Sequence, residues 1–459
     1  MESPEIDAYR LVVTRRNVSE VLLLENDSGW TVPQVEVSPC QRLAEQLTRE
    51  LREVFGVEAY CLLIPSVPGR GPAEDPKWAV MECKSQSVGN GRPAGFWVDP
   101  DTIGDWIEAS QAHLVCDVLA QLHRQATTGP FARPGWLEEL FRWTQKQVSP
   151  LGLRLTGVFR QLNASPEFSL VRMETDRRAV WFKATGQPNV HELSVTLALA
   201  GLFPHSVPQI FGVHREWNGW LSAEVAGTSL NQIPDFAAWE TAAEELAELQ
   251  ISSIGKTLEL HDAGARDLRI ARLVERIDPF LAQMDLLMAA QEKRQPLPLS
   301  GSELEILAEG LKESCALLET LHLPDTLGHI DLNPGNIFVS QTGCTFIDWA
   351  EACVTHPLLT FEYLRAHSDR SGIEQPAFSE HLVAVYMRPW TSFHSPDEMR
   401  RGLILSPLIA IFAYSVAHDS WRSPGLVHNQ GLAGYFRGLT RRMYREAIRT
   451  AQRSELCLS

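Results

Sequence analysis

One stretch of the chain gathers side chains that could hold a metal ion. Residues 328–350 contain His329, Asp331, Asn336 and Asp348 around two short apolar runs. Carboxylate and amide oxygens, completed by water and phosphate, are the ligands that Mg²⁺ prefers in proteins. This combination predicts a magnesium site of the kind that also binds a nucleotide.

The two apolar runs predict the geometry of this site. Residues 337–340 and 344–347 are rich in β-branched and aromatic residues, and residues 341–343 between them read as a three-residue hairpin loop that ends in glycine. The first residue of one run then faces the last residue of the other, and Asn336 lies opposite Asp348 with Cβ atoms about 4.5–5.5 Å apart. A plain hairpin with solvated polar ends fits the same spacing, so both interpretations stay open at this point.

The full string is more specific than the hairpin. The order His-x-Asp-(x)4-Asn, then a hairpin, then Ile-Asp, resembles the catalytic loop of protein kinases. The wording Asp-Leu-Asn-Pro-Gly-Asn at residues 331–336 and Ile-Asp-Trp at residues 347–349 is similar to the aminoglycoside phosphotransferase and choline kinase-like branch of that fold. Ile330 stands where this branch usually has glycine, a departure that leaves the role-bearing positions intact.

The resemblance implies a role for each polar residue of the stretch. Asp331 would be the catalytic base for an acceptor hydroxyl, and His329 would support the loop by hydrogen bonding. Asn336 and Asp348 would hold Mg²⁺, with ATP as the phosphoryl donor. The implied fold class is α+β: a two-lobed protein kinase-like fold with a β-rich N-lobe and a helical C-lobe.

The upstream segment supplies other parts of such a fold. Residues 155–162, 168–174 and 179–184 read as three strands, and the third carries Lys183 in an apolar run. Helical spacing follows and places Glu192 in the first turn of a helix. By resemblance to kinases, Lys183 would bind the ATP phosphates and Glu192 would orient it through an ion pair. A solvated edge lysine and a glutamate that favours the helix dipole are the alternative interpretation.

Two connections in this N-lobe are candidate nucleotide contacts. The turn at residues 163–166, which includes Ser165, would cover the phosphates through backbone N–H groups, although it has no glycine-rich signature. The apolar strand at residues 220–225 occupies the place of the segment that links the lobes in this fold. Backbone groups from Glu224 to Ala226 would then hold adenine, while an ordinary edge strand ending in a turn fits the same residues.

The remainder of the chain is predicted to be mostly helical, and the N-terminus is predicted to be a separate domain. Long helical patterns run from about residue 236 onward, and the last of them is basic and amphipathic, which predicts a surface helix packed on the C-lobe. The predicted division is an α/β domain at 1–126, a linker at 127–135, an N-lobe with its leading helix and hinge at 136–230, and a C-lobe with the acceptor site at 231–459.

The N-terminal domain carries a second, weaker resemblance. Trp-Thr-Val-Pro at residues 30–33 and Arg-Glu-Leu-x-Glu-x-x-Gly-Val at residues 49–57 resemble the Nudix hydrolase fold and its signature helix. The domain would then be α/β and Nudix-like.

The departures from that family bear on its chemistry. Glutamine and valine replace two glycines at residues 34–35, and Gln41 and Val54 stand where the family has glutamates. Glu50 and Glu53 remain on one helix face, where they could hold one ion weakly. Nudix chemistry needs several carboxylates to hold Mg²⁺ against a pyrophosphate, so we expect a domain that has lost hydrolysis.

Composition limits the class of protein. The chain has 459 residues, 44% hydrophobic and 21% charged, which is typical of a soluble globular protein with two to four domains. The formal charge of −16 disfavours nucleic-acid and anionic-membrane partners. There is no run of 18 apolar residues and no signal peptide pattern, so we expect a cytoplasmic protein. Eight scattered cysteines without CxxC spacing predict reduced, mostly buried thiols and no structural zinc.

Together these features predict an ATP- and Mg²⁺-dependent small-molecule kinase. Its partner would be an acceptor with a hydroxyl group, such as an aminoglycoside, an amino alcohol, a sugar, homoserine or a natural-product intermediate, and the sequence does not choose among them. Two alternatives are a pseudokinase that only binds ligands and a kinase fused to an active Nudix pyrophosphohydrolase. The complete set of kinase residues speaks against the first and the altered helix against the second. The sequence does not indicate an oligomeric state.

Overall fold

The computed structural model describes most of the chain. The residues described are 6–15, 18–27, 29–38, 42–65, 76–88, 95–125, 128–368, 370–371, 373 and 377–458, with the side chains of 85–88 and 454–458 left out. The chain divides into two compact units, residues 1–193 with 209–224 and residues 194–208 with 225–459. Cys40 and Gln41, for which the sequence gave predictions, lie outside this description, as does the side chain of Cys457.

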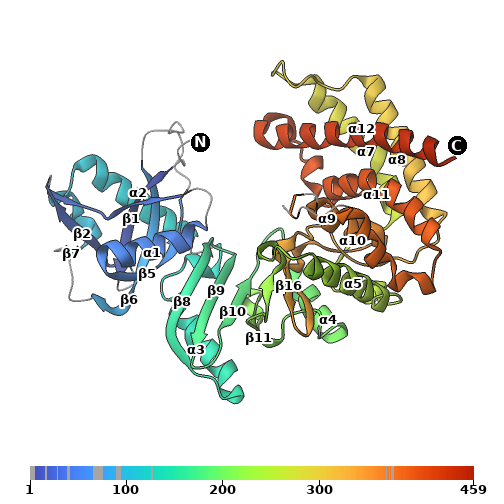
Figure 1. The fold of residues 1–459 in the computed structure, drawn as a ribbon. Helices are drawn as coiled ribbons and strands as arrows, with labels where there is room; N and C mark the ends of the chain where they lie inside the picture. Colours follow the sequence, from blue (N-terminus) through green and yellow to red (C-terminus); the bar gives the residue numbers. More distant parts are fainter. Residues whose placement is uncertain are drawn as a thin grey trace. The chain divides into compact units, whose positions relative to one another are not determined.

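The first unit begins with an α/β domain, shown in blue in Figure 1. Its elements are β1 (Asp7–Arg15), β2 (Glu20–Asn26), β3 (Gly29–Thr31), β4 (Gln34–Val37), α1 (Leu43–Phe55), β5 (Val57–Leu63), β6 (Lys77–Val88), β7 (Gly95–Val98) and α2 (Ala109–Gln125). The sheet runs β3-β2-β1-β6-β5, with β4 paired to β1, β7 paired to β2, and β1 parallel to β6. Alternate residues point to opposite faces: Leu11 and Val13 pack with α1, while Val12 packs with α2.

The same unit continues into a β-rich N-lobe. Its elements are α3 (Trp136–Val148), β8 (Leu155–Ala164), β9 (Ser169–Thr175), β10 (Val180–Ala184), the start of α4 (Glu192–Leu202), β11 (Ile210–His214) and β12 (Gly219–Ala223). They form an antiparallel sheet in the order β11-β12-β10-β9-β8. The sequence did not predict β11, because all five of its residues are half-buried and its register shifts next to Gly212, so no alternation of apolar and polar residues marks it.

The α/β domain and the N-lobe share one hydrophobic core. Trp136, the first residue of α3, is fully buried and makes edge-to-face contacts with Tyr60 of β5 and with Phe131, at ring-centroid distances of 5.8 and 5.2 Å. Phe131 also contacts Phe182 of β10. Because these aromatic rings belong to one buried cluster, the segment that joins the two parts is packed into the core.

The second unit is mainly helical. Its elements are the remainder of α4, then β13 (Thr228–Ser229), α5 (Phe236–Ser252), α6 (Thr257–Asp262), β14 (Arg266–Leu268), α7 (Ile270–Ala289), α8 (Gly301–Glu319), β15 (Thr326–His329), β16 (Ile337–Ser340), β17 (Gly343–Phe346), β18 (Ala352–Thr355), α9 (Pro357–Ser368), α10 (Phe378–Met387), α11 (Pro396–Val416) and α12 (Gln430–Leu458). Two small sheets, β13-β16-β17 and β14-β18-β15, lie among these helices. The predicted α+β class, with a β-rich N-lobe and a helical C-lobe, is confirmed.

Helix α11 is long and apolar enough to cross a membrane by length and composition. However, 78% of its most apolar window is buried inside the structure. It begins with a capping box in which Ser395 and Glu398 bond each other's main-chain N–H groups. Burial of this kind is typical of the core helix of a soluble domain.

Candidate active site

The loop that follows β15 is fixed by His329. This residue ends β15 and is 1% exposed, and its main-chain N–H donates to Thr360 Oγ1 at 3.1 Å. Its Nδ1 accepts from the Asp331 main-chain N–H at 3.3 Å, and its Nε2 donates to the Ile347 carbonyl at 3.2 Å. Burial lowers the pKa of His329, so the ring is neutral, as these bonds require. One imidazole therefore ties the loop at Asp331 to the chain immediately before Asp348.

Asp331 is exposed, and Asn333 supports it. The Asn333 side-chain N–H₂ group donates to the main-chain oxygen of Asp331 at 3.3 Å and to its Oδ1 at 3.4 Å, while Asn333 Oδ1 accepts from Gly335 N–H at 2.9 Å. This role of Asn333 was not predicted from the sequence. The signal was present, because an asparagine before Pro-Gly is a strong turn former whose side chain bonds the backbone two residues on.

The two predicted metal ligands flank this loop. Asn336 is buried and its Nδ2 donates to the Asp331 main-chain oxygen at 3.0 Å, so the amide is held with Oδ1 as its remaining acceptor. Asp348 has a left-handed backbone with φ of 66°, which is uncommon for a residue other than glycine. Against the dominant effect of burial, the charges of Asp348 and Asp331 raise the pKa of His329, so both carboxylates lie near that ring.

The predicted hairpin is present, but its predicted register is wrong. Strands β16 and β17 pair Ser340 with Gly343 and Ile337 with Phe346, which leaves a two-residue loop in place of the predicted three. Asn336 then lies opposite Ile347, whose N–H donates to the Asn336 carbonyl at 3.0 Å. The left-handed backbone of Asp348, and not strand pairing with Asn336, therefore sets the direction of the chain at this residue.

The position of Gly343 explains the shorter loop. Gly343 has φ of +119°, and a Cβ atom on it would lie 2.4 Å from Oε1 of Glu245, whose Oε2 accepts from Cys344 N–H at 2.8 Å. Ser340 Oγ accepts from Thr342 N–H at 3.2 Å and bonds the Gly343 carbonyl at 3.0 Å. The approach of α5 through Glu245 thus holds Gly343 in the ladder, a contact that the local sequence cannot reveal.

In the N-lobe, the expected ion pair between Lys183 and Glu192 is present. Lys183 Nζ lies 2.5 Å from Glu192 Oε1, and the two side chains are 15% and 1% exposed. Lys183 is on β10, the central strand, with Leu170 and Trp220 as its cross-strand neighbours. Its Nζ lies 5.8 Å from the centre of the Trp220 ring. A buried carboxylate needs a charged or hydrogen-bonding partner, and here that requirement fixes the lysine head group.

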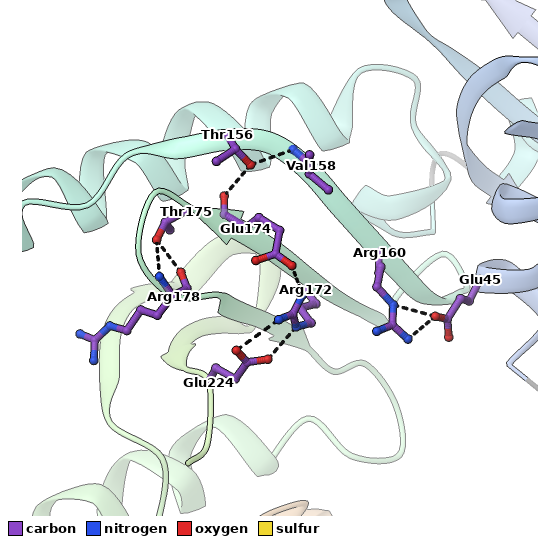
Figure 2. A network of polar contacts seen from close by, with 9 residues as sticks. All are labelled: Glu45, Thr156, Val158, Arg160, Arg172, Glu174, Thr175, Arg178 and Glu224. Atoms are coloured by element: carbon purple, nitrogen blue, oxygen red, sulfur yellow. Dashed lines mark hydrogen bonds and ion pairs between the residues drawn. The ribbon is translucent and has the colours of Figure 1, made fainter. Parts of the chain in front are cut away.

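Figure 2 shows what holds the predicted hinge residue Glu224. Arg172 of β9 donates to both carboxylate oxygens of Glu224, at 2.6 and 3.2 Å, and also bonds Glu174. The hydrogen bond to Glu224 is the main reason that the pKa of Arg172 is raised. The Glu224 side chain is therefore paired with Arg172 of the sheet, and Arg172 is a second residue whose role was not predicted from the sequence. The chain passes from the first compact unit to the second directly after Glu224, and Ala226 is exposed.

The predicted phosphate-covering turn at residues 163–166 joins β8 to β9. Ser165 Oγ accepts from the N–H of Phe168 at 3.0 Å, so this hydroxyl shapes the turn itself. The structure thus places Lys183, Glu192, Ser165 and Glu224 in the first unit, and His329, Asp331, Asn336 and Asp348 in the second unit.

A pocket of about 710 Å³ opens beside Asp331 within the second unit. Asp331 and Asn333 form one wall, while Asn231, Trp239 and His367 contribute others. Burial and Arg370 lower the pKa of His367, while the charge of Asp331, which lines the same pocket, acts in the opposite direction. The pocket is a candidate site for an acceptor whose hydroxyl would meet Asp331.

The donor atoms of Asn336 and Asp348 are oxygens of the kind that Mg²⁺ prefers. Within the described part of the chain, no group of three or more His, Cys, Asp or Glu side chains is arranged to hold a metal ion. Asn336 and Asp348 offer one amide oxygen and one carboxylate, and Mg²⁺ is usually bound by one or two carboxylates with water and substrate phosphates. This pair suits a metal that arrives with a nucleotide.

Helix α1 of the N-terminal domain is the second predicted magnesium position, and two of its acidic residues are paired with arginines. Arg49 lies 3.1 Å from Glu50 Oε1, and Glu45 is paired with Arg160 of β8. Glu53 is exposed on the same helix. Two of these carboxylates are thus paired with arginines.

Comparison with known proteins supports the kinase-like part of the chain. Residues 175–390 match the phosphotransferase enzyme family. A search of curated proteins finds no match. The family match begins at residue 175, so it does not bear on the N-terminal domain.

Many solved structures resemble the chain at low identity. They include an ethanolamine kinase of Plasmodium vivax, with 14% identity over 64% of this chain and 82% of that one and a TM-score of 0.43. The choline kinase LicA of Streptococcus pneumoniae shows 13% identity over 68% and 98%, with a TM-score of 0.43. The macrolide 2′-phosphotransferase MphH of Brachybacterium faecium shows 14% identity over 66% and 98%, with a TM-score of 0.45.

Proposed function

We propose that the chain is a kinase that transfers the γ-phosphate of ATP to a hydroxyl group of a small molecule. The observation that carries this proposal is the hydrogen-bond network in which His329, Asn333 and Asn336 all bond to Asp331. This network holds one exposed carboxylate at the wall of a pocket large enough for a small acceptor. The family match over residues 175–390 supports the same reaction class.

Each residue has one task in this proposal. Asp331 orients the acceptor hydroxyl and takes its proton, and Asn333 fixes the direction of that carboxylate. Lys183, oriented by Glu192, binds the nucleotide phosphates. Asn336 and Asp348 would hold Mg²⁺, which when bound would neutralise phosphate charge. Phosphoryl transfer asks for little covalent chemistry from the protein, so positioning by these residues supplies most of the catalysis.

A screen for acceptor-dependent ADP production tests the proposal. The full chain is incubated with ATP and Mg²⁺ and with aminoglycosides, amino alcohols, sugars and homoserine in separate reactions. We expect one class to raise ADP formation well above the acceptor-free rate, and chelation by EDTA to abolish the increase. Magnesium-dependent ATP binding without acceptor-dependent ADP formation in any class would instead favour a pseudokinase.

For the N-terminal domain we propose a Nudix-like fold that does not hydrolyse pyrophosphates. The support is the pairing of Glu50 with Arg49 and the replacement of a further family glutamate by Val54, which is exposed at the end of α1. A helix with so few available carboxylates is a poor site for the metal that this chemistry needs.

A further inference from the structure

The turn at residues 163–166 has no glycine, and the structure indicates what holds it in place. We propose that the N-terminal α/β domain is a positioning element of the kinase nucleotide site, which acts through Gln161 on β8 to hold this turn. The proposal rests on the function proposed above, since it assigns the turn to the nucleotide phosphates.

The central contact is a pair of hydrogen bonds between Gln161 and Cys61. Gln161 is 1% exposed, its Oε1 accepts from the Cys61 main-chain N–H at 2.8 Å, and its Nε2 donates to the Cys61 carbonyl at 2.9 Å. Cys61 lies on β5, at the end of the sheet order β3-β2-β1-β6-β5. The Gln161 amide therefore satisfies an edge strand in the way that a neighbouring strand would.

Weaker contacts flank this pair along β8. Arg160 is paired with Glu45 of α1 (Figure 2), with Arg160 Nε 2.7 Å from Glu45 Oε1. Lys84 of β6 donates to the Gly157 carbonyl at 2.6 Å, and its Nζ lies 4.8 Å from the centre of the Phe159 ring. The Arg160 side chain is 57% exposed, so its ion pair contributes little in water. The buried Gln161 pair is the contact whose loss leaves main-chain groups without partners.

The turn itself is also held from the N-terminal side. Ala164 packs against the core cluster formed by α1 and the sheet of the α/β domain. The N–H of Phe131, in the segment that joins the two parts, donates to the Pro166 carbonyl at 3.1 Å. Gly129 approaches the same carbonyl so closely that a Cβ atom would lie 2.1 Å from it. Both ends of the turn are thus fixed by residues that precede the kinase-like part of the chain.

This arrangement explains how a turn without glycine could bind phosphate. A glycine-rich loop can bring its N–H groups to the phosphates by adjusting its backbone, whereas a turn of other residues must already have the binding conformation. External contacts that hold such a turn lower the ordering cost of binding and so raise affinity. The domain would therefore contribute to nucleotide binding without touching the nucleotide.

The chain offers a matched control for the test. Gln46 is also buried and makes the same two-way contact, accepting from Ser38 N–H at 2.9 Å and donating to the Ser38 carbonyl at 2.8 Å. That contact lies wholly within the α/β domain. Gln161→Leu and Gln46→Leu therefore remove the same chemistry, and only the first removes a contact to β8.

The experiment measures the Kd of the full chain for a non-hydrolysable ATP analogue with Mg²⁺, together with the KM for ATP and for the acceptor. We expect Gln161→Leu to raise the Kd and the KM for ATP about tenfold, with little change in the KM for the acceptor, because two main-chain groups lose their partners. Gln46→Leu should change the ATP constants less than twofold. Hydrogen exchange at residues 163–168 should become faster only in Gln161→Leu.

The outcomes separate the inference from the proposed function. If the unchanged chain binds no nucleotide, both fail. If it binds nucleotide and both glutamine variants bind it as tightly, the inference alone fails. If Gln161→Leu does not fold, Lys84→Met, which keeps the apolar stem and loses the bond to Gly157, replaces it. That variant should raise the Kd for the analogue about threefold, and an unchanged Kd would overturn the inference.

Discussion

Helix α1 and the loop of residues 329–348 both carry acidic residues, and a Mg²⁺ site was predicted in each, but the acidic residues have different partners in the two regions. On α1, Glu50 is paired with Arg49 and Glu45 with Arg160. In the loop, Asp331 accepts from the Asn333 amide and is linked through its N–H to a neutral His329. On α1, two carboxylates are thus paired with arginines, whereas in the loop uncharged groups position Asp331.

The difference matters because a metal ion must compete with any cation that is already present. A charge-assisted bond to arginine is stronger than a neutral one, and it also cancels the charge that attracts Mg²⁺. An amide or a neutral imidazole fixes the direction of a carboxylate and leaves its charge available. The identity of its partner therefore says more about whether a carboxylate is available to a metal ion than the count of acidic residues does.

The largest expected effect comes from removing the negative charge of Asp331 in the loop. Asp331→Asn keeps the size of the side chain and removes the base, so we expect turnover with acceptor to fall about 10³-fold while ATP binding changes little. Acceptor-dependent ADP formation and the Kd for an ATP analogue measure the two quantities. Asp397→Asn, at the start of α11, serves as a surface control. A near-normal rate in Asp331→Asn would show that another group is the base.

The next effect concerns the metal. Asp348→Asn removes one charged oxygen from the predicted Mg²⁺ site, so the Mg²⁺ concentration for half-maximal activity should rise at least as much as when an outer partner of a metal site is lost, about 10- to 100-fold. A Mg²⁺ titration of the phosphotransfer rate gives this value directly. An unchanged Mg²⁺ requirement would remove Asp348 from the metal site and weaken the contrast with α1.

The sequence was sufficient for the parts of the site that depend on local order. It predicted the strand that carries Lys183, the helix that begins at Glu192 and the hairpin after Asn336, because each has its own apolar pattern. It gave the wrong hairpin register, because Glu245, about 100 residues away, fixes Gly343. No pattern in the chain predicts the left-handed backbone of Asp348.

The ion pair between Glu45 of α1 and Arg160 is another contact that the local sequence could not predict. The positions at which α1 departs from the Nudix pattern could be read from the sequence, but the arginine that binds Glu45 lies on β8, 115 residues further along the chain. Long-range contacts of this kind arise from the packing of one element on another. The sequence therefore indicated the departures from that pattern, and the structure shows that Glu45 and Glu50 are paired with arginines.

A smaller effect follows from the neutral state of His329. Burial lowers the pKa of His329 in the folded chain, while in the unfolded chain the pKa of this histidine is about 6.5. As the pH falls, the unfolded state binds this proton first. The contribution of His329 to the free energy of unfolding is therefore fully present above that pH and decreases below it, by about 1.4 kcal/mol per pH unit. His329→Gln should lack this component, as urea unfolding between pH 7.5 and 5.5 would reveal. Equal acid sensitivity in both chains would mean that the ring is charged in the fold.

The smallest expected effect is the one that completes the comparison. Glu50→Gln and Glu53→Gln should change the Mg²⁺ dependence of phosphotransfer less than twofold, because Glu50 of α1 is already paired with Arg49. An Asp331→Asn background sharpens the test, since any phosphate released there from nucleoside diphosphate derivatives would come from the N-terminal domain. We expect none, with or without Glu50. Measurable phosphate release that disappears in Glu50→Gln would show that the ion pair with Arg49 opens to admit Mg²⁺. A carboxylate paired with arginine could then still bind a metal ion.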